Sequence, residues 1–383
     1  KTFNKQEHDS DVPPRKIQRI VEDKNGYIWV KTIDRKLYVF NKVTECFHAV
    51  YDDMKNYSEN IQVIKLQNTA EGDVLLLTKD KNLLLAGVDE KGQVTIKILF
   101  DSRDEINKHD YTLKHHVLCE TEEYISWIGT DYKVSAVHKG AELASRPADF
   151  ITSKINSGDK DSFTSFFEDG RKVWVGDRAG IFYSIDVRTG LVNRYVLSEI
   201  KGAISNLLVT PAGYVYLSVA GQGTYEYDLA ERRLQKINTE MNDAMVTHAF
   251  IDQYDKIWFH ENEKALIYYD PLNHTAKRFP FTMFGKITTL YSEDAGERGL
   301  FFLSPAGEAW LFDREHAEMV YINKLKQLSN DRANQQFYHL MLDNDGVLWL
   351  SSADEGVYCM NFPKKQFNLL SLSPQSAGRE NYA

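Results

Sequence analysis

The sequence predicts an all-β protein, a β-propeller of four-stranded antiparallel blades, on three observations. A phrase with an acidic turn followed by a tryptophan recurs about every 40–50 residues, which is typical of repeat architectures. Segments of alternating apolar and polar residues follow one another between Gly, Asn and Asp turns, as strands and hairpins do. No long segment has the 3.6-residue period of a helix. Radial four-stranded units leave only short, protected edges, so a propeller suits such a chain.

The recurring phrase is clearest at the two ends of the chain, where it runs from Asp23 to Trp29 and from Asp343 to Trp349. Between these copies the same pattern gives Asp169-Gly170 with Trp174, Gly213 with Tyr216, and Asp255 with Trp258. Five of the six tryptophans occupy this second-strand position, and Trp310 occupies the third-strand aromatic position. Large aromatics at one position of each repeat predict packing between neighbouring blades.

The first unit illustrates the four predicted strands. Its strands are expected at Ile17 to Glu22, Tyr27 to Val30, Leu37 to Asn41 and Cys46 to Val50, with Asn25-Gly26 forming the first turn. Third strands end in an acid or amide, which is expected to bond backbone N–H groups of the next turn. Residues 1–383 are interpreted as one propeller domain with eight units, near 17–50, 61–100, 115–150, 163–197, 204–237, 246–279, 287–322 and 337–370.

Composition excludes several classes of protein. A hydrophobic content of 43% in 383 residues argues against general disorder, and a net charge of −9 without a basic stripe argues against nucleic-acid binding. No apolar stretch is long enough to cross a bilayer. The three cysteines, Cys46, Cys119 and Cys359, lack metal or redox spacing and are expected to be small buried residues. No cofactor, metal site or catalytic motif is predicted from the sequence. Adjacent His115 and His116 point to opposite faces of a strand, so they cannot bind one metal ion together.

Second strands of the form Gly-x-x-Trp-(Ile/Val)-Gly-(Thr/Asp), followed by a Leu-Tyr-x-Tyr-Asp third strand, resemble the two-component regulator propeller repeat. The matching stretches are Gly26 to Asn41, Trp127 to Thr130, Gly170 to Asp186 and Gly346 to Asn361. The resemblance covers nearly the whole chain. It implies a propeller of seven blades, whereas eight units are counted here.

The resemblance also implies a function. Such repeats form the periplasmic sensor region of Bacteroides-type hybrid two-component systems, in which histidine kinase and response-regulator modules share one polypeptide. A second propeller, a β-sandwich and a membrane span usually follow, and many members sense oligosaccharides released from glycans. The chain is therefore expected to be one non-enzymatic domain of a membrane-anchored receptor, with no membrane contact of its own. Its expected partners are the neighbouring modules of the receptor, and the parent receptor could form a homodimer.

Candidate ligand-binding residues are expected in the loops between second and third strands, which share a face with the loops that enter the first strands. These loops are predicted to ring one mouth of the central channel, a concave place for convergent polar groups. Arg35 or Arg178 could hold a carboxylate or sulfate on an acidic sugar by bidentate hydrogen bonds. The full set is Arg35, Lys81, Asp131, Lys133, Arg178, Gln222, Asn262 and Asp354.

Three alternatives remain open from the sequence. The charged loop tips could simply be solvated. The protein could be a propeller carbohydrate-active enzyme, a lyase or a sialidase-like enzyme, for which an arginine cluster would have to come from Arg15, Arg19, Arg35 and Arg178. It could also be a scaffold whose faces contact other proteins. Because fold analogy carries much of the sensor prediction, these alternatives need a structural test.

Overall fold

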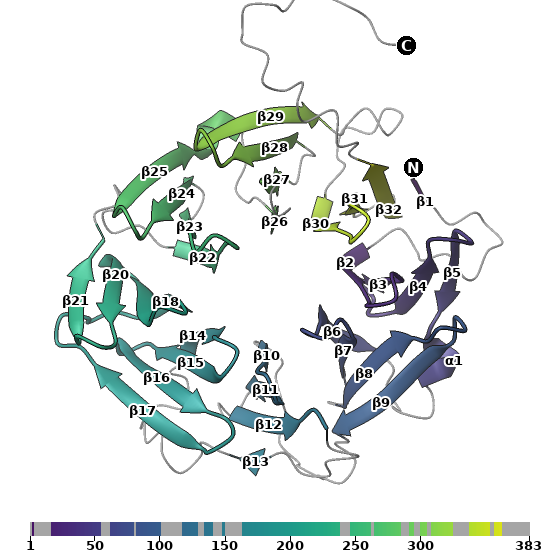
Figure 1. Cartoon of the computed structure of the whole chain (residues 1–383), viewed down its shortest axis with the longest axis horizontal. Helices are drawn as coiled ribbons and strands as arrows, with labels where there is room; N and C mark the ends of the chain where they lie inside the picture. The colour runs from purple at the N-terminus through teal and green to yellow at the C-terminus, as the bar shows by residue number, and fades with distance from the viewer. Residues whose placement is uncertain are drawn as a thin grey trace, which may run out of the picture.

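The computed structural model describes residues 2–3, 17–54, 62–79, 82–100, 117–128, 134–140, 148–149, 163–237, 246–261, 264–284, 291–294, 299–304, 308–324, 337–352 and 356–361. Within these ranges the strands form eight four-stranded antiparallel sheets. The sheets stand as blades around a central opening, each with its first strand innermost (Figure 1). The number of blades is the eight counted from the repeats, and not the seven that the resemblance implies.

The first four blades follow chain order. Blade one contains β2 (Ile17–Glu22), β3 (Ile28–Thr32), β4 (Leu37–Asn41) and β5 (Cys46–Ala49). Blade two contains β6 (Val63–Asn68), β7 (Val74–Thr78), β8 (Leu83–Val88) and β9 (Val94–Phe100). Blade three contains β10 (Val117–Glu120), β11 (Tyr124–Ile128), β12 (Val134–His138) and β13 (Ala148–Asp149). Blade four contains β14 (Phe163–Glu168), β15 (Lys172–Asp177), β16 (Ile181–Asp186) and β17 (Leu191–Val196).

The next three blades repeat this order. Blade five contains β18 (Ile204–Val209), β19 (Tyr214–Val219), β20 (Gly223–Asp228) and β21 (Arg233–Lys236). Blade six contains β22 (Val246–Ile251), β23 (Ile257–Glu261), β24 (Ala265–Asp270) and β25 (Thr275–Pro280). Blade seven contains β26 (Tyr291–Asp294), β27 (Leu300–Leu303), β28 (Glu308–Asp313) and β29 (Glu318–Lys324).

Blade eight closes the ring with strands from both ends of the chain. Its order is β1-β32-β31-β30, where β30 is Phe337–Leu342, β31 is Val347–Ser352, β32 is Gly356–Asn361 and β1 is Thr2–Phe3. The outermost strand β1 pairs with β32 (Figure 1), with Thr2 opposite Tyr358 and Phe3 opposite Val357. This pairing covers the edge that β32 would otherwise expose.

Two short helices, α1 (Tyr51–Met54) and the 3-10 turn η2 (Phe281–Phe284), accompany the blades. No helix in the described residues is long and apolar enough to cross a membrane. Cys46 is exposed on the outer strand β5, so the prediction of a buried cysteine is wrong there, because an outermost strand has no blade beyond it. Cys359 is half-buried on β32.

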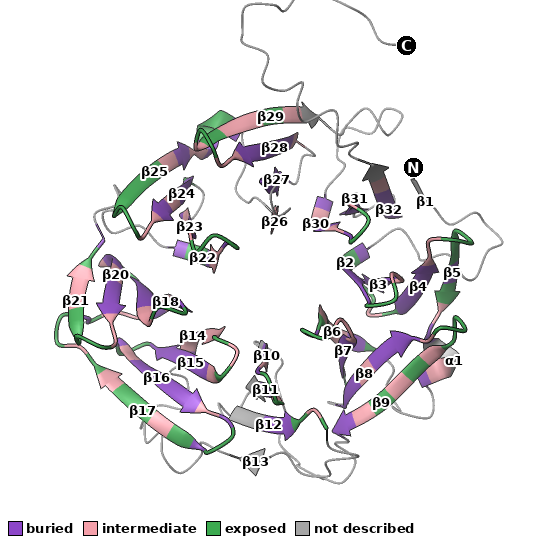
Figure 2. Ribbon diagram, viewed as in Figure 1, coloured by how far each residue is buried: buried purple, intermediate pink, exposed green. Residues whose placement is uncertain are grey.

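Apolar clusters join neighbouring blades, as the aromatic pattern predicts. The middle strands of the blades are mostly buried, whereas the outer strands are half-buried or exposed (Figure 2). Trp258 of blade six is fully buried against blade seven, with ring centroids 5.3 Å from Phe302 and 4.6 Å from Phe312. Trp349 of blade eight packs 5.5 Å from Phe40 of blade one. The predicted packing role of these tryptophans is therefore confirmed.

The acid of the recurring phrase also bonds the indole of its own blade. The indole N–H groups of Trp29, Trp174, Trp258 and Trp349 donate to Asp23, Asp169, Asp252 and Asp343 at 2.9, 2.7, 3.2 and 2.8 Å. In blade six the acid is Asp252, not the Asp255 that the sequence pattern paired with Trp258. Asp255 has a φ of 57° and takes the left-handed turn position that glycine occupies in other blades.

Two blades without the tryptophan replace the acid as well. In blade two Thr69 stands with Leu75, and in blade five Thr210 stands with Tyr216. Each threonine Oγ1 accepts the backbone N–H that closes the turn, from Asp73 at 3.0 Å and from Tyr214 at 3.2 Å. A threonine hydroxyl therefore closes the turn as the carboxylate does, and the four aspartates in addition accept an indole N–H.

The acids that end the third strands form the turns that the sequence predicts. Asp186 Oδ1 accepts hydrogen bonds from the backbone N–H groups of Arg188 and Thr189 at 3.0 and 2.9 Å. The same contact is made by Asn41, Asp228, Asp270 and Asp313. Because five blades share this geometry, the turns on this end of the blades are similar in shape, and differences between them lie in the side chains.

Candidate functional site

Each blade presents its turns on two opposite faces of the ring, because successive turns of an antiparallel meander lie at opposite ends. We call the face formed by the first-to-second and third-to-fourth turns the Asp-turn face. The second-to-third turns, which carry the residues predicted from the sequence, lie on the other face. Two cavities of the described structure open on the Asp-turn face, away from the second-to-third turns.

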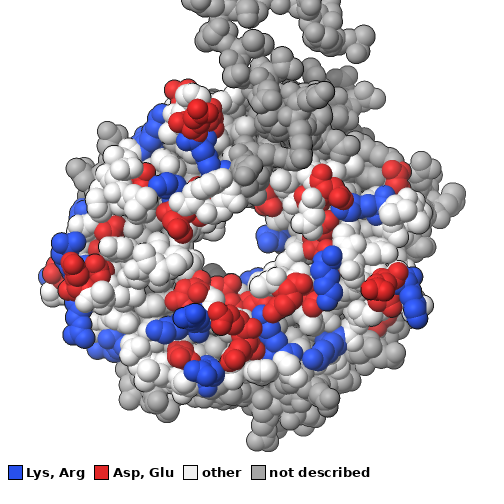
Figure 3. All heavy atoms as spheres, in the orientation of Figure 1, with Lys and Arg blue, Asp and Glu red and all other residues white. Residues whose placement is uncertain are grey.

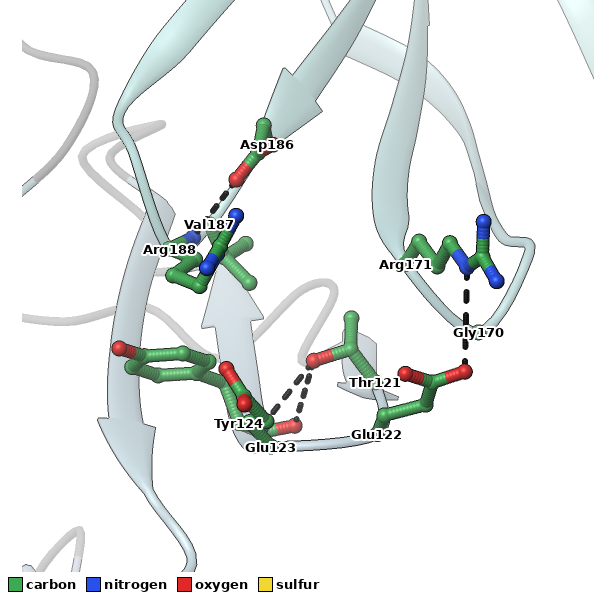
Figure 4. A pocket seen from close by; sticks show the side chains of 9 residues that line it. All are labelled: Thr121, Glu122, Glu123, Tyr124, Gly170, Arg171, Asp186, Val187 and Arg188. Carbon is green, nitrogen blue, oxygen red and sulfur yellow. Dashed lines mark hydrogen bonds and ion pairs between the residues drawn. The ribbon is translucent and has the colours of Figure 1, made fainter.

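The first cavity lies between blades three and four and has a volume of about 320 Å³. Its wall combines the β10–β11, β14–β15 and β16–β17 turns (Figure 4). Tyr124 and Arg188 lie on one side, and Arg171 with its partner Glu122 on the other (Figure 4). The lining residues are Thr121, Glu122, Glu123, Tyr124, Gly170, Arg171, Asp186, Val187 and Arg188.

Backbone contacts hold this cavity open between two blades. The N–H of Glu122 donates to the carbonyl of Gly170 at 2.8 Å and joins the two first turns. Thr121 Oγ1 accepts the N–H of Tyr124 at 3.1 Å and shapes the turn below the aromatic ring. The half-buried Tyr124 ring meets His138 edge to face, with centroids 5.2 Å apart. The Tyr124 ring is thus held in place among charged groups and remains partly open to solvent.

The chemistry available in this cavity is hydrogen bonding. Backbone N–H bonds, first that of Thr189, lower the pKa of Asp186, so this carboxylate stays ionised and accepts hydrogen bonds. Arg171 and Arg188 donate, and Glu122 and Glu123 are further carboxylates of the wall. Alternating donors and acceptors beside an aromatic ring suit a polar ligand such as a sugar.

An acidic rim follows the inner strands on the same face. Glu120 and Glu168 end the first strands β10 and β14, and acidic side chains gather there beside the central opening (Figure 3). Glu120 Oε2 accepts the N–H of Ala70 from blade two at 2.8 Å, and Glu168 accepts the N–H of Glu120. Lys139 binds Glu120 at 2.5 Å and Glu71 at 2.9 Å. These carboxylates link successive blades around the ring.

Burial, together with the neighbouring charge of Glu120, raises the pKa of Glu168 to about 7. Replacing Glu168 by glutamine is therefore expected to flatten the pH dependence of stability between pH 5 and 7.5. The unfolded carboxyl loses its proton near pH ~4.3 and the folded one near pH 7, so wild-type stability falls as pH rises through that window, by on the order of 2 kcal/mol. Urea unfolding at several pH values measures this, with the exposed Glu318→Gln as control. Equal slopes in wild type and Glu168→Gln would contradict it.

The second cavity, of about 440 Å³, lies over the seam between blades eight and one. Glu22, Asp343 and Asp345 approach one another there as metal ligands do. However, Lys42 Nζ occupies their centre, at 2.8 Å from Glu22, 3.3 Å from Asp343 and 2.5 Å from Asp345. Burial alone would lower the pKa of Lys42, but its bonds to Asp345 and Glu22 raise it overall. The cluster is an internal ion network that joins the two ends of the chain.

Three of the residues predicted from the sequence lie in the described structure. Arg35 is half-buried in blade one and Arg178 is exposed in blade four, with blades two and three between them. Gln222 is used within the fold, because its Oε1 accepts the N–H of Lys201 at 2.8 Å. The other five, Lys81, Asp131, Lys133, Asn262 and Asp354, lie outside the described residues. Arg35 and Arg178 therefore do not act on one small group together.

The structure instead places Arg35 with two cations that were not in the predicted set. Lys31 is buried, at 5% exposure, on β3. Its pKa is lowered to about 8 by burial and then by the charges of Arg35 and Arg19. Lys31 stands where blade four has Gly176, but other blades have Leu77, Ser218, His260 or Ser351 at this position, so the sequence carried only a weak signal for Lys31. The turn before Tyr124 departs from the repeat, because it has Thr121 in place of the acid and no glycine, whereas the turn with Arg188 matches the other blades.

Comparisons with known proteins agree with this architecture. No family model and no curated protein matches the sequence. The solved structure of BamB from Moraxella catarrhalis is similar over 91% of this chain and 94% of its own, with a TM-score of 0.54 and 11% identity. The protein is a β-propeller. At this identity the similarity describes the fold alone.

The propeller also resembles two structures at lower scores. One is the extracellular domain of a hybrid two-component system from B. thetaiotaomicron, with a TM-score of 0.49, 13% identity, and 90% of this chain against 52% of that one. The propeller thus spans about half of that domain. The other is a streptogramin B lyase, with a TM-score of 0.48, 11% identity and coverage of 95% and 97%.

Proposed function

We propose that this propeller is a ligand-sensing domain of a hybrid two-component receptor in the periplasm. It would bind a glycan-derived oligosaccharide without catalysis. The observation that carries the binding function is the cavity built jointly by blades three and four, with Tyr124 and Arg188 on one side and Arg171 on the other. The receptor context rests on the resemblance of the repeats in the sequence. The neighbouring modules of the parent would be its partners.

Signalling would follow from the position of the cavity between two blades. The blades meet there through the Glu122 N–H to Gly170 carbonyl bond and the 3.8 Å contact between Arg171 and Glu122. A ligand that binds both turns stabilises one relative position of the blades over others. Only such a difference in affinity between two arrangements can shift the parent receptor toward its active state.

The binding test is calorimetric titration of the propeller with a panel of neutral and acidic oligosaccharides. We expect one member to bind, and Tyr124→Ala to weaken its affinity about tenfold, because an aromatic contact of this kind contributes about 1–1.5 kcal/mol. Arg171→Ala tests the other side of the cavity without disturbing the core, since Arg171 is exposed. Tyr321→Ala, an exposed tyrosine on β29, is the matched control.

Three results would contradict the proposal. Turnover of any bound oligosaccharide would favour an enzyme. A parent gene that encodes neither kinase modules nor a membrane span beside this propeller would exclude the receptor. Equal weakening by Tyr124→Ala and Tyr321→Ala would move the ligand away from this cavity.

A further inference from the structure

Blade one brings two cations together on its inner strands. Arg19 of β2 and Lys31 of β3 are directly opposite in the antiparallel register, so their side chains leave the same face of the sheet. A register shift between Ile17 and Arg19 makes Gln18 an extra, bulged residue just before this pair. Blade four has Ser165 opposite Gly176 at the same positions. Like charges directly opposite are destabilising, so blade one departs from its repeat at an energetic cost.

The position equivalent to Lys31 is tightly packed in blade four. In blade four a Cβ added to Gly176 would come within 2.4 Å of Ser165 Oγ and 2.8 Å of Ile204 in the next blade. Lys31 at the equivalent position is buried, and its Nζ donates to the neutral Oε1 of Gln18. A buried ammonium bonded to a neutral oxygen keeps an uncompensated charge.

Arg35 adds the third cation. Its backbone is held in the left-handed region, with φ 69°, by its N–H bond to the Thr32 carbonyl at 3.0 Å. The Arg35 carbonyl also accepts the N–H of Val63 from blade two at 2.9 Å. The adjacent acid, Asp34, is bonded to Thr32 Oγ1 and lies 3.6 Å from Lys36. No ion pair of Arg35 or Lys31 with a carboxylate is found among the described residues.

A histidine from the neighbouring blade borders the same place. His339 of β30 has a buried Nδ1 without a hydrogen-bond partner in the described part of the chain. Burial, and next the charge of Arg19, lower the pKa of His339 to about 3, so the ring is neutral at pH 7. Glu293 is the acid that acts on Arg19. Three cations thus lie with one neutral imidazole and one acid, Glu293. This part of blade one therefore carries a net positive charge beside the channel.

We propose that Arg19, Lys31 and Arg35 form a binding site for an oxyanion, the carboxylate or sulfate group of an acidic sugar. Guanidinium groups bind such planar or tetrahedral oxyanions by paired hydrogen bonds, and an ammonium adds a point charge. An anion would relieve the repulsion between Arg19 and Lys31, so the site gains more from a charged ligand than from a neutral one. This site in blade one is separate from the cavity between blades three and four, and its biological meaning rests on the proposed sensor function.

The test is titration calorimetry with inorganic sulfate, a galacturonate disaccharide, a sulfated disaccharide and a neutral disaccharide, all at one ionic strength and pH 7. We expect sulfate and one acidic disaccharide to bind wild type, and the better of the two disaccharides identifies the source of the oxyanion. Lys31→Gly, which introduces the residue of blade four, and Arg35→Ala are expected to weaken this binding at least tenfold. Arg233→Ala, an exposed arginine on the outer strand β21, is the matched control and should bind as wild type does.

Thermal melting separates loss of the site from loss of the fold. Without anion, Lys31→Met should melt at or above the wild-type temperature, because it removes a buried charge and fills the same space; with sulfate, only wild type and Arg233→Ala should gain stability. Absence of anion binding to wild type, or equal loss in Arg233→Ala, would overturn the site.

The sensor function and the anion site can each be overturned while the other stands. A neutral oligosaccharide that binds through Tyr124 while no anion binds would overturn the anion site and leave the sensor function standing. Anion binding that depends on Lys31, in a parent gene without kinase modules, would support the site and overturn the receptor.

Discussion

Replacing Asp23 by alanine is expected to lower the free energy of unfolding by about 3–4 kcal/mol, since each buried donor left unsatisfied costs about 1–3 kcal/mol. The carboxylate is almost fully buried, at 1% exposure. Its Oδ1 accepts the N–H groups of Asn25 and Tyr27, both at 3.0 Å. Its Oδ2 accepts the indole N–H of Trp29 at 2.9 Å and the N–H of Val88, in blade two, at 3.2 Å. One side chain thus satisfies a turn, a core indole and the next blade.

Two further variants identify which of these bonds matters. Asp89→Ala removes a carboxylate that accepts only two turn N–H groups, from Lys91 and Gln93, and should cost about 1 kcal/mol. Asp23→Thr introduces the residue of blades two and five, which accepts the N–H of the turn but leaves the indole N–H without an acceptor. We therefore expect a loss of unfolding free energy between those of the two alanine variants. Urea unfolding measures all three. If Asp23→Ala and Asp89→Ala cost the same, the indole and the inter-blade bond contribute nothing.

Replacing Lys42 by methionine is expected to cost about 3 kcal/mol, in the range found when one partner of a buried ion pair is removed. Lys42 lies between Glu22 and the fully buried carboxylate of Asp343, and it also reaches Asp345. Glu22 Oε2 in addition accepts the N–H of Asn344 at 2.7 Å. Without the ammonium, carboxylates from blades one and eight would face each other across the seam that closes the ring.

The stability loss caused by Lys42→Met should depend on pH. Protonation of one carboxylate relieves the repulsion in the variant, so the deficit of Lys42→Met should shrink between pH 7 and pH 5 as measured by urea unfolding. The control is Lys36→Met, whose lysine forms an exposed pair with Asp34 at 3.6 Å and should change stability by less than about 0.5 kcal/mol. A deficit that grows on acidification, or a loss no larger than that of Lys36→Met, would contradict the role of the network.

The sequence predicted the repeats well because their signals are local. Strand alternation, the turn glycines and the aromatic at most second strands all lie within a few residues of one another, and the structure confirms the four-stranded units. The error at Asp255 has a local cause too, since an aspartate in a left-handed turn looks like the acid of the phrase when its glycine is missing. The bond to Trp258 belongs to Asp252, three residues earlier.

The candidate sites were harder to predict because they join blades. The cavity with Tyr124 and Arg188 needs turns from both blades three and four, and no pattern within one repeat shows that these turns meet. Arg35 and Arg178 were each predicted as a ligand-binding residue, and the structure places blades two and three between them. Lys31 stands at a position that varies from blade to blade, so its residue type alone did not set it apart.

The sequence by itself determined the architecture of this protein: a meander of four-stranded units, the residues that turn each one, and the aromatic layer between them. These depend on contacts between residues near in the chain, which one repeat contains. Only the tertiary structure decided which units meet and which charges share a space. Lys42 and Asp343 are 301 residues apart in the chain, and Arg19 faces His339 only because the ring closes. Ring closure brings such residues together, and no pattern within one repeat predicts which distant residues will meet.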